Sequence, residues 1–477
     1  MCALTTVPVG ILPPERFDDV VLARQRREID EAAAHARDVL GDHIVWSINS
    51  TATGGGVAEM LHSLLAYARG AGVDARWLVI QGDDEFFRLT KRLHHHLHGS
   101  HGDGGPLGDA EREVFDRVTR RNVAELRSVV RPGDIVLVHD PQPAGLVKPL
   151  LDHGAHVVWR SHIGIDLHND AVAEAWDFLL PYVRPAEALV FTRGEYVPGP
   201  LRDRPHIIIP PSIDAFSTKN QELAPADVRA ILATTGIVES HGHGSPQYVR
   251  RDGTLATVSM VASIDRDGPL RSTDPVVLQV SRWDPLKDPV GVLQGFAQGV
   301  AGATDAHLVL AGPDPAEVTD DPEGARVYGD CVVARRALPE DVRRRVHLVN
   351  LSMRDAEENG AVVNALQRHA HVVVQKSLAE GFGLTVAEAM WKARPVVATN
   401  VGGIRDQIED GVSGLLLDDG HDLEGFAERV RRLLLDRHEA RLMGERGQRR
   451  IRAYFLGGRH LVQYLNLFRD LLADDAR

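Results

Sequence analysis

The sequence contains two series of short apolar runs rich in β-branched residues, and most runs are followed by a segment with helical periodicity. This alternation is typical of parallel β-sheets that are covered by helices on both faces. The first series predicts strands at 43–48, 74–80, 134–138, 156–160, 187–192 and 206–210. The second series predicts strands at 276–281, 307–311, 346–350, 371–375, 395–398 and 414–417. The predicted fold class is therefore α/β, with two doubly wound Rossmann-like domains.

The length of 477 residues also favours two domains, because a single hydrophobic core rarely grows to that size. We predict an N-terminal domain over 1–215 and a C-terminal domain over 216–454. The amphipathic pattern within 455–477 follows a second domain that already looks complete, so we expect it to form a helix that crosses back to the first domain. The stretch 217–274 has no clear periodicity, and near 238–272 we expect a surface insertion or loop without regular structure.

Charge and cysteine content exclude several classes of partner. The chain has 54 basic and 67 acidic residues, for a net charge of −13, which argues against nucleic acid or an anionic membrane as the main partner. Its two cysteines, Cys2 and Cys331, are too far apart to suggest a disulfide framework or a metal motif, as is usual in a reducing compartment. No secretory signal and no apolar run of membrane-spanning length is visible. We therefore expect a cytoplasmic protein that acts on small molecules.

The strongest candidate site is the segment from Glu380 to Glu388, in which two carboxylates bracket a Gly-Phe-Gly turn. A predicted strand ends at residue 375 and a helical pattern begins at Leu384, so this turn connects a strand to a helix. The first amides of a helix suit a phosphate or a polarised sugar oxygen, whereas ionised carboxylates accept hydrogen bonds from hydroxyl groups. On the spacing alone, a purely structural role for the glutamates in helix capping is equally compatible.

Two basic residues follow the first predicted strand of the second series. Arg282 and Lys287 lie on this strand-end loop, where a guanidinium fork and an ammonium group would together hold a diphosphate. Simple solvation of a charged loop is the alternative. The diphosphate hypothesis gains weight because ligands of open parallel sheets bind at the carboxyl ends of the strands, where the Gly-Phe-Gly turn is also expected.

In the first series, polar residues follow three predicted strands. The first strand ends at Asn49 and leads to Gly54, Gly55 and Gly56 at the start of a helix, a loop that can offer backbone amides to an anion. A plain tight turn is as compatible with three glycines. A dinucleotide-binding fingerprint would require glycine at position 59, which is Glu59, so a nicotinamide cofactor is disfavoured.

Two further strand ends carry histidine. One supplies His139, Asp140 and Gln142, and its neighbour supplies Arg160 and His162. A single histidine at the rim of a sheet is more often structural than catalytic. Two histidine-containing strand ends in one sheet favour a polar pocket.

A separate cluster of histidines invites a metal hypothesis. It contains His94, His95, His96, His98 and His101. Three consecutive residues of a helix cannot all face one ion, and no carboxylate or cysteine is spaced in the sequence to complete a site. No metal site is therefore predicted.

Taken together, these residues resemble the retaining glycosyltransferases of family 4, which have the two-domain GT-B fold. The resemblance covers about 44–472 apart from the insertion. It is carried by the two glutamates Glu380 and Glu388 together with Arg282 and Lys287. Within that family the chain is similar to the trehalose glycosyltransferring synthases, and trehalose phosphorylases share many of the same strings. These strings are 49–59, 139–143, 159–162, 279–285, 321–324 and 380–391.

The resemblance implies two Rossmann-like domains that face each other across a cleft. The C-terminal domain is expected to hold a nucleotide sugar, with Glu388 at the ribose hydroxyls and Arg282 and Lys287 at the diphosphate. Glu380 and the backbone at Gly381, Phe382, Gly383, Leu384 and Thr385 are expected at the donor glucose.

The N-terminal domain is expected to hold the acceptor. Its implied binding residues are Asn49, Gly54, Gly55, Gly56, His139, Gln142 and Arg160. The implied catalytic residues of the whole protein are Arg282, Lys287, Glu380, His162 and Asp140.

The implied reaction moves glucose from a nucleoside diphosphate glucose, either UDP-glucose or ADP-glucose, to free glucose and gives α,α-trehalose reversibly. The resemblance implies no prosthetic group and no required metal, although a divalent cation would be compatible with the donor, and a homodimer is expected. Trehalose phosphorylase activity and transfer to a different acceptor are alternatives, since the insertion and the histidines at 95, 96 and 98 depart from the family pattern. A non-catalytic regulator that binds sugar nucleotides is a further alternative, which the intact donor residues disfavour.

Overall fold

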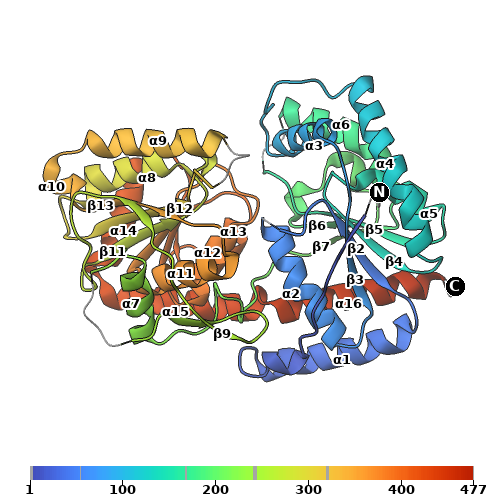
Figure 1. Ribbon diagram of the computed structural model, residues 1–477, viewed down its shortest axis with the longest axis horizontal. Helices are drawn as coiled ribbons and strands as arrows, with labels where there is room; N and C mark the ends of the chain where they lie inside the picture. The colour runs from blue at the N-terminus through green and yellow to red at the C-terminus, as the bar shows by residue number, and fades with distance from the viewer. Residues whose placement is uncertain (1–3, 54, 167–168, 240–243, 318–321, 476–477) are drawn as a thin grey trace. The chain divides into compact units, whose positions relative to one another are not determined.

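The computed structural model describes residues 4–53, 55–166, 169–239, 244–317 and 322–475 (Figure 1). The chain divides into two compact units. The first unit comprises Met1–Ser212 together with Phe455–Arg477, and the second comprises Ile213–Tyr454. Each unit is built around a seven-stranded sheet.

The sheet of the first unit has the strand order β1-β3-β2-β4-β5-β6-β7. All six strands of the first predicted series are present and parallel, whereas β1 adds an antiparallel strand beside β3 that was not predicted. The strands are β1 (Thr5–Val7), β2 (Val45–Asn49), β3 (Ala75–Val79), β4 (Ile135–His139), β5 (His156–Ser161), β6 (Ala188–Phe191) and β7 (His206–Ile208).

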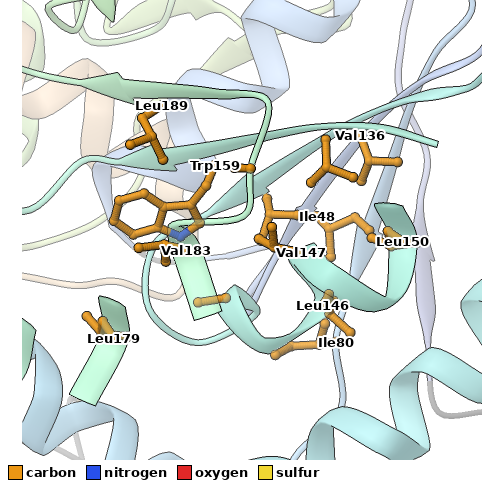
Figure 2. Packing of buried hydrophobic residues seen from close by; sticks show 14 of the residues in the cluster. Ile48, Ile80, Val136, Leu146, Val147, Leu150, Trp159, Leu179, Val183 and Leu189 are labelled. Carbon is orange, nitrogen blue, oxygen red and sulfur yellow. The ribbon is translucent and has the colours of Figure 1, made fainter. Parts of the chain in front are cut away.

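The helices of the first unit are α1 (Ala23–Leu40), α2 (Gly56–Gly70), α3 (Asp84–Leu97), α4 (Asp109–Val129), α5 (Val147–Leu151), α6 (Asp170–Val183) and α16 (Gly457–Asp475). Figure 2 shows Ile48, Val136 and Trp159 from three strands in one cluster with Val147 of α5 and Val183 of α6. Each fully buried aliphatic side chain, such as Ile48, stabilises the fold by about 1.5–3 kcal/mol.

The helix α16 returns to the first unit from the end of the chain and packs on α1 and α2. Its approach to α1 is close, because a Cβ atom on Gly458 would lie 2.7 Å from Cδ1 of Ile29. Leu461, Leu465 and Phe468 of α16 are buried. The hydrophobic core of the first unit is therefore completed by the last helix of the sequence.

The sheet of the second unit has the order β10-β13-β12-β11-β14-β15-β16. It contains all six strands of the second predicted series in parallel, and β10 adds an antiparallel strand beside β13. The strands are β10 (Ser263–Asp265), β11 (Val276–Val280), β12 (His307–Pro313), β13 (Val346–Leu351), β14 (Val372–Gln375), β15 (Val396–Thr399) and β16 (Leu415–Leu417). Together with the first sheet, these strands confirm the predicted α/β class with two mainly parallel sheets.

The second unit contains helices of widely different lengths. They are α7 (Pro225–Thr234), α8 (Pro289–Gly295), α9 (Pro322–Arg336), α10 (Glu340–Arg343), α11 (Ala356–His369), α12 (Leu384–Trp391), α13 (Ile404–Gln407), α14 (Leu423–Leu435) and α15 (Arg437–Tyr454). Asparagine or aspartate side chains cap the first amides of several helices in both units, as at Asp83, Asn169, Asp355 and Asp422.

The stretch 217–274, which has no clear periodicity in the sequence, is largely structured where it is described. It holds α7, a hairpin of β8 (Gln247–Val249) and β9 (Leu255–Thr257), and the edge strand β10. Each of these strands is three residues long, which is too short to produce a periodic pattern in the sequence. Residues 240–243 of the expected insertion lie outside the described residues.

The strand order reverses once inside each sheet, and this point is where open α/β sheets bind ligands. In the first unit, the reversal lies between β2 and β4, and in the second unit between β11 and β14. The loops after β11 and β14 contain the predicted donor-site residues, and the loops after β2 and β4 contain part of the predicted acceptor site. No helix among the described residues is long and apolar enough to cross a membrane.

Candidate active site

In the second unit, the structure brings together two of the predicted catalytic residues. Lys287 comes from the loop after β11 and Glu380 from the loop after β14, and Nζ of Lys287 lies 2.6 Å from Oε2 of Glu380. The two side chains are only 16% and 12% exposed, so solvent screens this ion pair less than a surface pair. Residues that are 93 positions apart in the sequence therefore meet at the reversal point of the sheet.

Polar side chains on both strands hold this pair in place. Gln279 of β11 donates through Nε2 to the carbonyl oxygen of Lys287 at 3.0 Å, and the Ser377 hydroxyl donates to Oε2 of Glu380 at 3.3 Å. Ser377 in turn accepts a hydrogen bond from Gln375 at 2.8 Å. Nearby, the buried ammonium of Lys376 pairs with Asp288 and with the Gly420 carbonyl. These interactions fix the positions of the charged groups before any ligand is bound.

The Gly-Phe-Gly turn is shaped by contacts within the unit. Gly383 adopts φ +84°, and a Cβ atom there would lie 2.9 Å from Ile404, so both the conformation and the space favour glycine. Phe382 is buried, and its carbonyl accepts a hydrogen bond from Gln407 at 2.5 Å. The backbone and Ile404 therefore already require glycine at 383, and the expected place of this backbone at the donor glucose stays a prediction. A Cβ atom on Gly381 would meet nothing within 4 Å.

The second glutamate of the motif, Glu388, lies on α12 and is almost completely buried. Lys392, which caps the end of this helix, donates from Nζ to Gln367 at 2.8 Å and to Asn220 at 2.9 Å. Burial lowers the pKa of Lys392, and the nearby Glu388 carboxylate opposes that shift. Thr385, one helical turn earlier, donates its hydroxyl to Gln375 at 3.1 Å. The motif is thus connected to the core of the unit through both Thr385 and Glu388.

Arg282 is placed differently from the other predicted donor residues. Its guanidinium is 66% exposed and donates to Asp284 at 2.7 Å. Its role at a diphosphate therefore remains a prediction. Leu384 begins α12, and its first-turn position agrees with the predicted junction between strand and helix.

In the first unit, the predicted glycine loop is only partly described. Gly54 lies outside the described residues, Gly55 adopts φ +82° as the cap of α2, and Gly56 is the first residue of that helix. The Asn49 side chain forms two hydrogen bonds within the unit, and its role in substrate binding stays a prediction. It accepts a hydrogen bond from the Trp77 indole at 2.8 Å and donates to the Thr51 carbonyl at 2.7 Å.

The two histidine-containing strand ends meet, as predicted. His139 ends β4 and His162 follows β5, and their rings stack with Nδ1 of His139 3.1 Å from Nε2 of His162. Asp140 accepts a hydrogen bond from the His162 amide at 2.7 Å and adopts φ +67°, a left-handed conformation that aspartate tolerates better than most residues. Gln142 lies half-buried on the same loop.

The hydrogen bonds of this pair define its tautomers. Nε of Arg160 donates to Nδ1 of His162 at 3.4 Å, so the proton of the neutral His162 ring is on Nε2 and is donated to Nδ1 of His139. The proton of His139 is then on its Nε2, a buried atom for which the described residues provide no partner. Burial lowers the pKa of His139 to about 3 and that of His162 well below its usual value, so both rings are neutral at pH 7.

Arg160 is fully buried, and its Nη1 and Nη2 atoms have no hydrogen-bond partner among the described residues. The cluster around it includes two residues of α16 that were not predicted from the sequence, His460 and Tyr464. Nδ1 of His460 lies 2.8 Å from the Ser212 hydroxyl, while its Nε2 and the Tyr464 hydroxyl have no partner in the described chain. Unpaired buried donors are costly, and they suit an oxygen-rich ligand.

The Asp140 carboxyl is the titrating group of this cluster. Burial raises its pKa to about 7, against the opposing effects of the His162 amide and the Arg160 guanidinium. In the unfolded chain the group titrates near 3.8, so its contribution to stability is fully present below pH 3.8 and is lost as the pH rises through 7. The folded protein therefore holds a proton on Asp140 over a pH range in which an ordinary carboxyl is ionised.

We predict that Asp140→Asn removes this pH-dependent contribution, because asparagine keeps the left-handed backbone but does not titrate. The free energy of unfolding of the wild type, minus that of the variant, should fall as the pH rises from 4 to 7. Urea unfolding at a series of pH values measures this difference. Asp152→Asn, which changes an exposed carboxylate paired with Lys148, is the matched control. A pH-independent difference for Asp140→Asn would contradict the assignment.

The histidine cluster lies beside a carboxylate of the same unit. The structure places Nε2 of His96 3.3 Å from Glu174 and Nδ1 of His101 3.8 Å from the same carboxylate. Glu174 is contributed by a helix more than seventy residues further along the chain, so the spacing of carboxylates in the sequence could not reveal it, and the absence of a metal site stays an untested prediction. Only one of the three consecutive histidines takes part, as the geometry of a helix requires.

Comparisons with known proteins agree on one family. The model of the trehalose synthase N-terminal domain matches residues 47–198, and that of glycosyl transferases group 1 matches residues 261–450. A trehalose synthase of Rubrobacter xylanophilus is 36% identical over 449 residues, which cover 93% of this chain and 94% of that protein. A trehalose phosphorylase of Pleurotus sajor-caju is 26% identical over 78% of this chain and 50% of its own length.

Among solved structures, an alpha,alpha-trehalose-phosphate synthase (UDP-forming) from Burkholderia vietnamiensis has a similar fold. The TM-score is 0.65 at 14% identity, and the match covers 91% of this chain and 99% of that chain. This likeness confirms the predicted two-domain GT-B fold class.

Proposed function

Since the chain belongs to the trehalose synthase family of glycosyltransferases, we propose that it moves glucose from a nucleoside diphosphate glucose to free glucose. The product is α,α-trehalose, the configuration at the donor anomeric carbon is retained, and the reaction is reversible. The observation that carries the proposal is the Lys287–Glu380 pair, which places an ammonium and a carboxylate together at the reversal point of a parallel sheet. This pair offers a cation for a diphosphate and an acceptor for sugar hydroxyls.

In the proposed donor subsite, the bond between the anomeric carbon and the diphosphate oxygen breaks. Lys287 stabilises the charge that develops on that oxygen, because a fixed cation in a site with little solvent acts more strongly than in water. Glu380 holds Lys287 and accepts hydrogen bonds from the glucose hydroxyls. Arg282 would reach the diphosphate by leaving Asp284, and Glu388 would accept hydrogen bonds from the ribose.

In the proposed acceptor subsite, Arg160 and His139 donate hydrogen bonds to sugar oxygens. Their buried donor atoms have no other partner among the described residues. The acceptor hydroxyl attacks the anomeric carbon from the face that the diphosphate leaves, and its proton passes to the departing phosphate oxygen. This sequence needs no carboxylate nucleophile.

The test uses purified protein with trehalose and, in separate reactions, UDP, ADP, GDP or inorganic phosphate. We expect one nucleoside diphosphate to yield free glucose and the corresponding nucleoside diphosphate glucose, identified by mass and chromatography. In the forward direction, NMR of the product should show a single α-anomeric signal, because the two glucose units of α,α-trehalose are equivalent by symmetry. If only phosphate reacts and yields glucose 1-phosphate, the protein is a phosphorylase and the proposal fails. Nucleotide binding without turnover would instead indicate a regulator.

We propose as well that turnover needs no prosthetic group and no added metal, and that the active form is a homodimer. Turnover should be unchanged after treatment with EDTA if no metal is needed. Light scattering during size-exclusion chromatography measures the mass of the eluting protein and so tests the homodimer, which a monomer mass would contradict.

A further inference from the structure

The three potential metal ligands His96, His101 and Glu174 come from separate segments of the first unit. His96 lies near the end of α3, His101 lies on the loop that follows, and Glu174 lies on α6. One ligand atom from each side chain lies within 4.8 Å of the other two. The closest pair, Nε2 of His96 and Oε2 of Glu174 at 3.3 Å, already has about the separation of two ligands in a tetrahedral zinc site with bonds of about 2.0–2.1 Å.

The hydrogen bonding of His96 is the arrangement found in metal-binding histidines. Its Nδ1 lies 3.0 Å from the Arg92 carbonyl, to which it donates, so Nε2 carries the lone pair and faces Glu174. Such a bond from the second ring nitrogen fixes both the tautomer and the orientation of a metal ligand. His96 is 1% exposed, so its ring has little freedom to turn away.

The loop that carries His101 is fixed on both sides of this residue. On one side, Asn169, which also caps α6, donates to the Gly99 carbonyl at 2.8 Å. On the other side, Arg92 forms two hydrogen bonds to Asp103 at 2.6 Å and 3.0 Å. The loop is thereby tied to both helices that supply the other two ligands.

We infer that His96, His101 and Glu174 form a binding site for a divalent transition-metal ion, with zinc as the expected occupant. Two imidazoles and one carboxylate are a donor set that zinc accepts, and a fourth position is left for water. Glu174 and His101 are 54% and 60% exposed, so an ion can enter from solvent and both side chains are free to draw their ligand atoms closer to His96 on coordination. The ion would link the end of α3 to α6, and it has no part in the proposed glycosyl transfer.

The first test is zinc binding to the full chain, prepared without a histidine tag and stripped with a chelator. Competition with a chromogenic chelator should show that His101→Ala and Glu174→Gln each lower the affinity at this site by at least about tenfold, since even the loss of an outer-shell partner has that effect. His206→Ala, which removes an exposed histidine of the same unit that lies outside the cluster, should bind zinc like the wild type. Equal zinc affinity in all four proteins would overturn the proposal, as would a wild type that binds none.

The second test distinguishes a site that links two helices from adventitious surface binding. A ligand that binds only the folded state raises its stability, so zinc should raise the unfolding midpoint of the wild type and of His206→Ala but not that of His101→Ala. Cobalt should give visible absorption bands in the wild type and in His206→Ala, and these bands should be absent in His101→Ala. All of these measurements are independent of turnover, so they separate this site from the proposed activity. An identical thermal shift in the wild type and His101→Ala would reject the assignment.

Discussion

Lys287→Ala should lower turnover by about two to three orders of magnitude, which is the usual effect of removing one preorganised group that stabilises developing charge. The lysine pairs with Glu380 at 2.6 Å, and it lies where the diphosphate of the donor is proposed to bind. The expected loss is in kcat, because the charge on the leaving oxygen develops in the transition state. Steady-state rates of NDP-glucose formation from trehalose measure the effect.

Lys287→Ala should leave the protein folded, because Glu380 is partly exposed and keeps the Ser377 hydroxyl as a partner. Circular dichroism and the thermal midpoint verify this. The matched control is Lys148→Ala, which removes a lysine whose side chain is 66% exposed and pairs with Asp152 at the surface. This change should alter neither turnover nor the thermal midpoint appreciably. Normal turnover in Lys287→Ala would sink the assignment of a diphosphate site.

Arg160→Met should increase stability while it abolishes most of the activity. The guanidinium is fully buried, and two of its nitrogen atoms lack partners in the described chain, so the folded state carries an uncompensated desolvation cost. Replacing a buried charge with an apolar side chain of similar volume is often neutral or stabilising by about 1–4 kcal/mol. Two lost hydrogen bonds from a charged group, at about 1.5–3 kcal/mol each, should reduce kcat/KM for the acceptor at least about 100-fold.

The control is a second buried arginine whose partners are present. Arg335 pairs with Asp265 at 2.6 Å and Asp267 at 3.2 Å and donates to the Val346 carbonyl, so Arg335→Met should destabilise the protein by about 3–5 kcal/mol. Urea unfolding compares the two variants, and acceptor titration follows activity. If Arg160→Met destabilises the protein as much as Arg335→Met does, Arg160 is a structural residue and the proposed acceptor site is misplaced.

The sequence predicted the parallel core of both sheets because those strands are buried on both faces and therefore form continuous apolar runs. The two edge strands β1 and β10 were not predicted. Each is three residues long and only partly buried, so neither produces a recognisable pattern. The hairpin of β8 and β9 was not predicted for the same reason, because Tyr248 is the one deeply buried residue in its two short strands.

Site residues were predictable where the carboxyl ends of neighbouring strands in a sheet lie side by side. This rule placed Lys287 near Glu380 and His139 near His162. It could not identify His460 and Tyr464, which reach the same cluster from a helix about three hundred residues later. Glu174 was missed for a similar reason, since the α3–α6 contact depends on helix packing rather than on sequence spacing.

The return of α16 to the first unit has a consequence for how the protein folds as it is made. The ribosome releases Met1–Ser212 long before the final helix, and all of Ile213–Tyr454 must be synthesised in between. At ~5–20 residues per second this delay is on the order of tens of seconds. The first unit must wait that long with the surface of α1 and α2 uncovered, whereas the second unit is contiguous and can fold as soon as it emerges. The half of the protein that is translated first is therefore the half that is finished last.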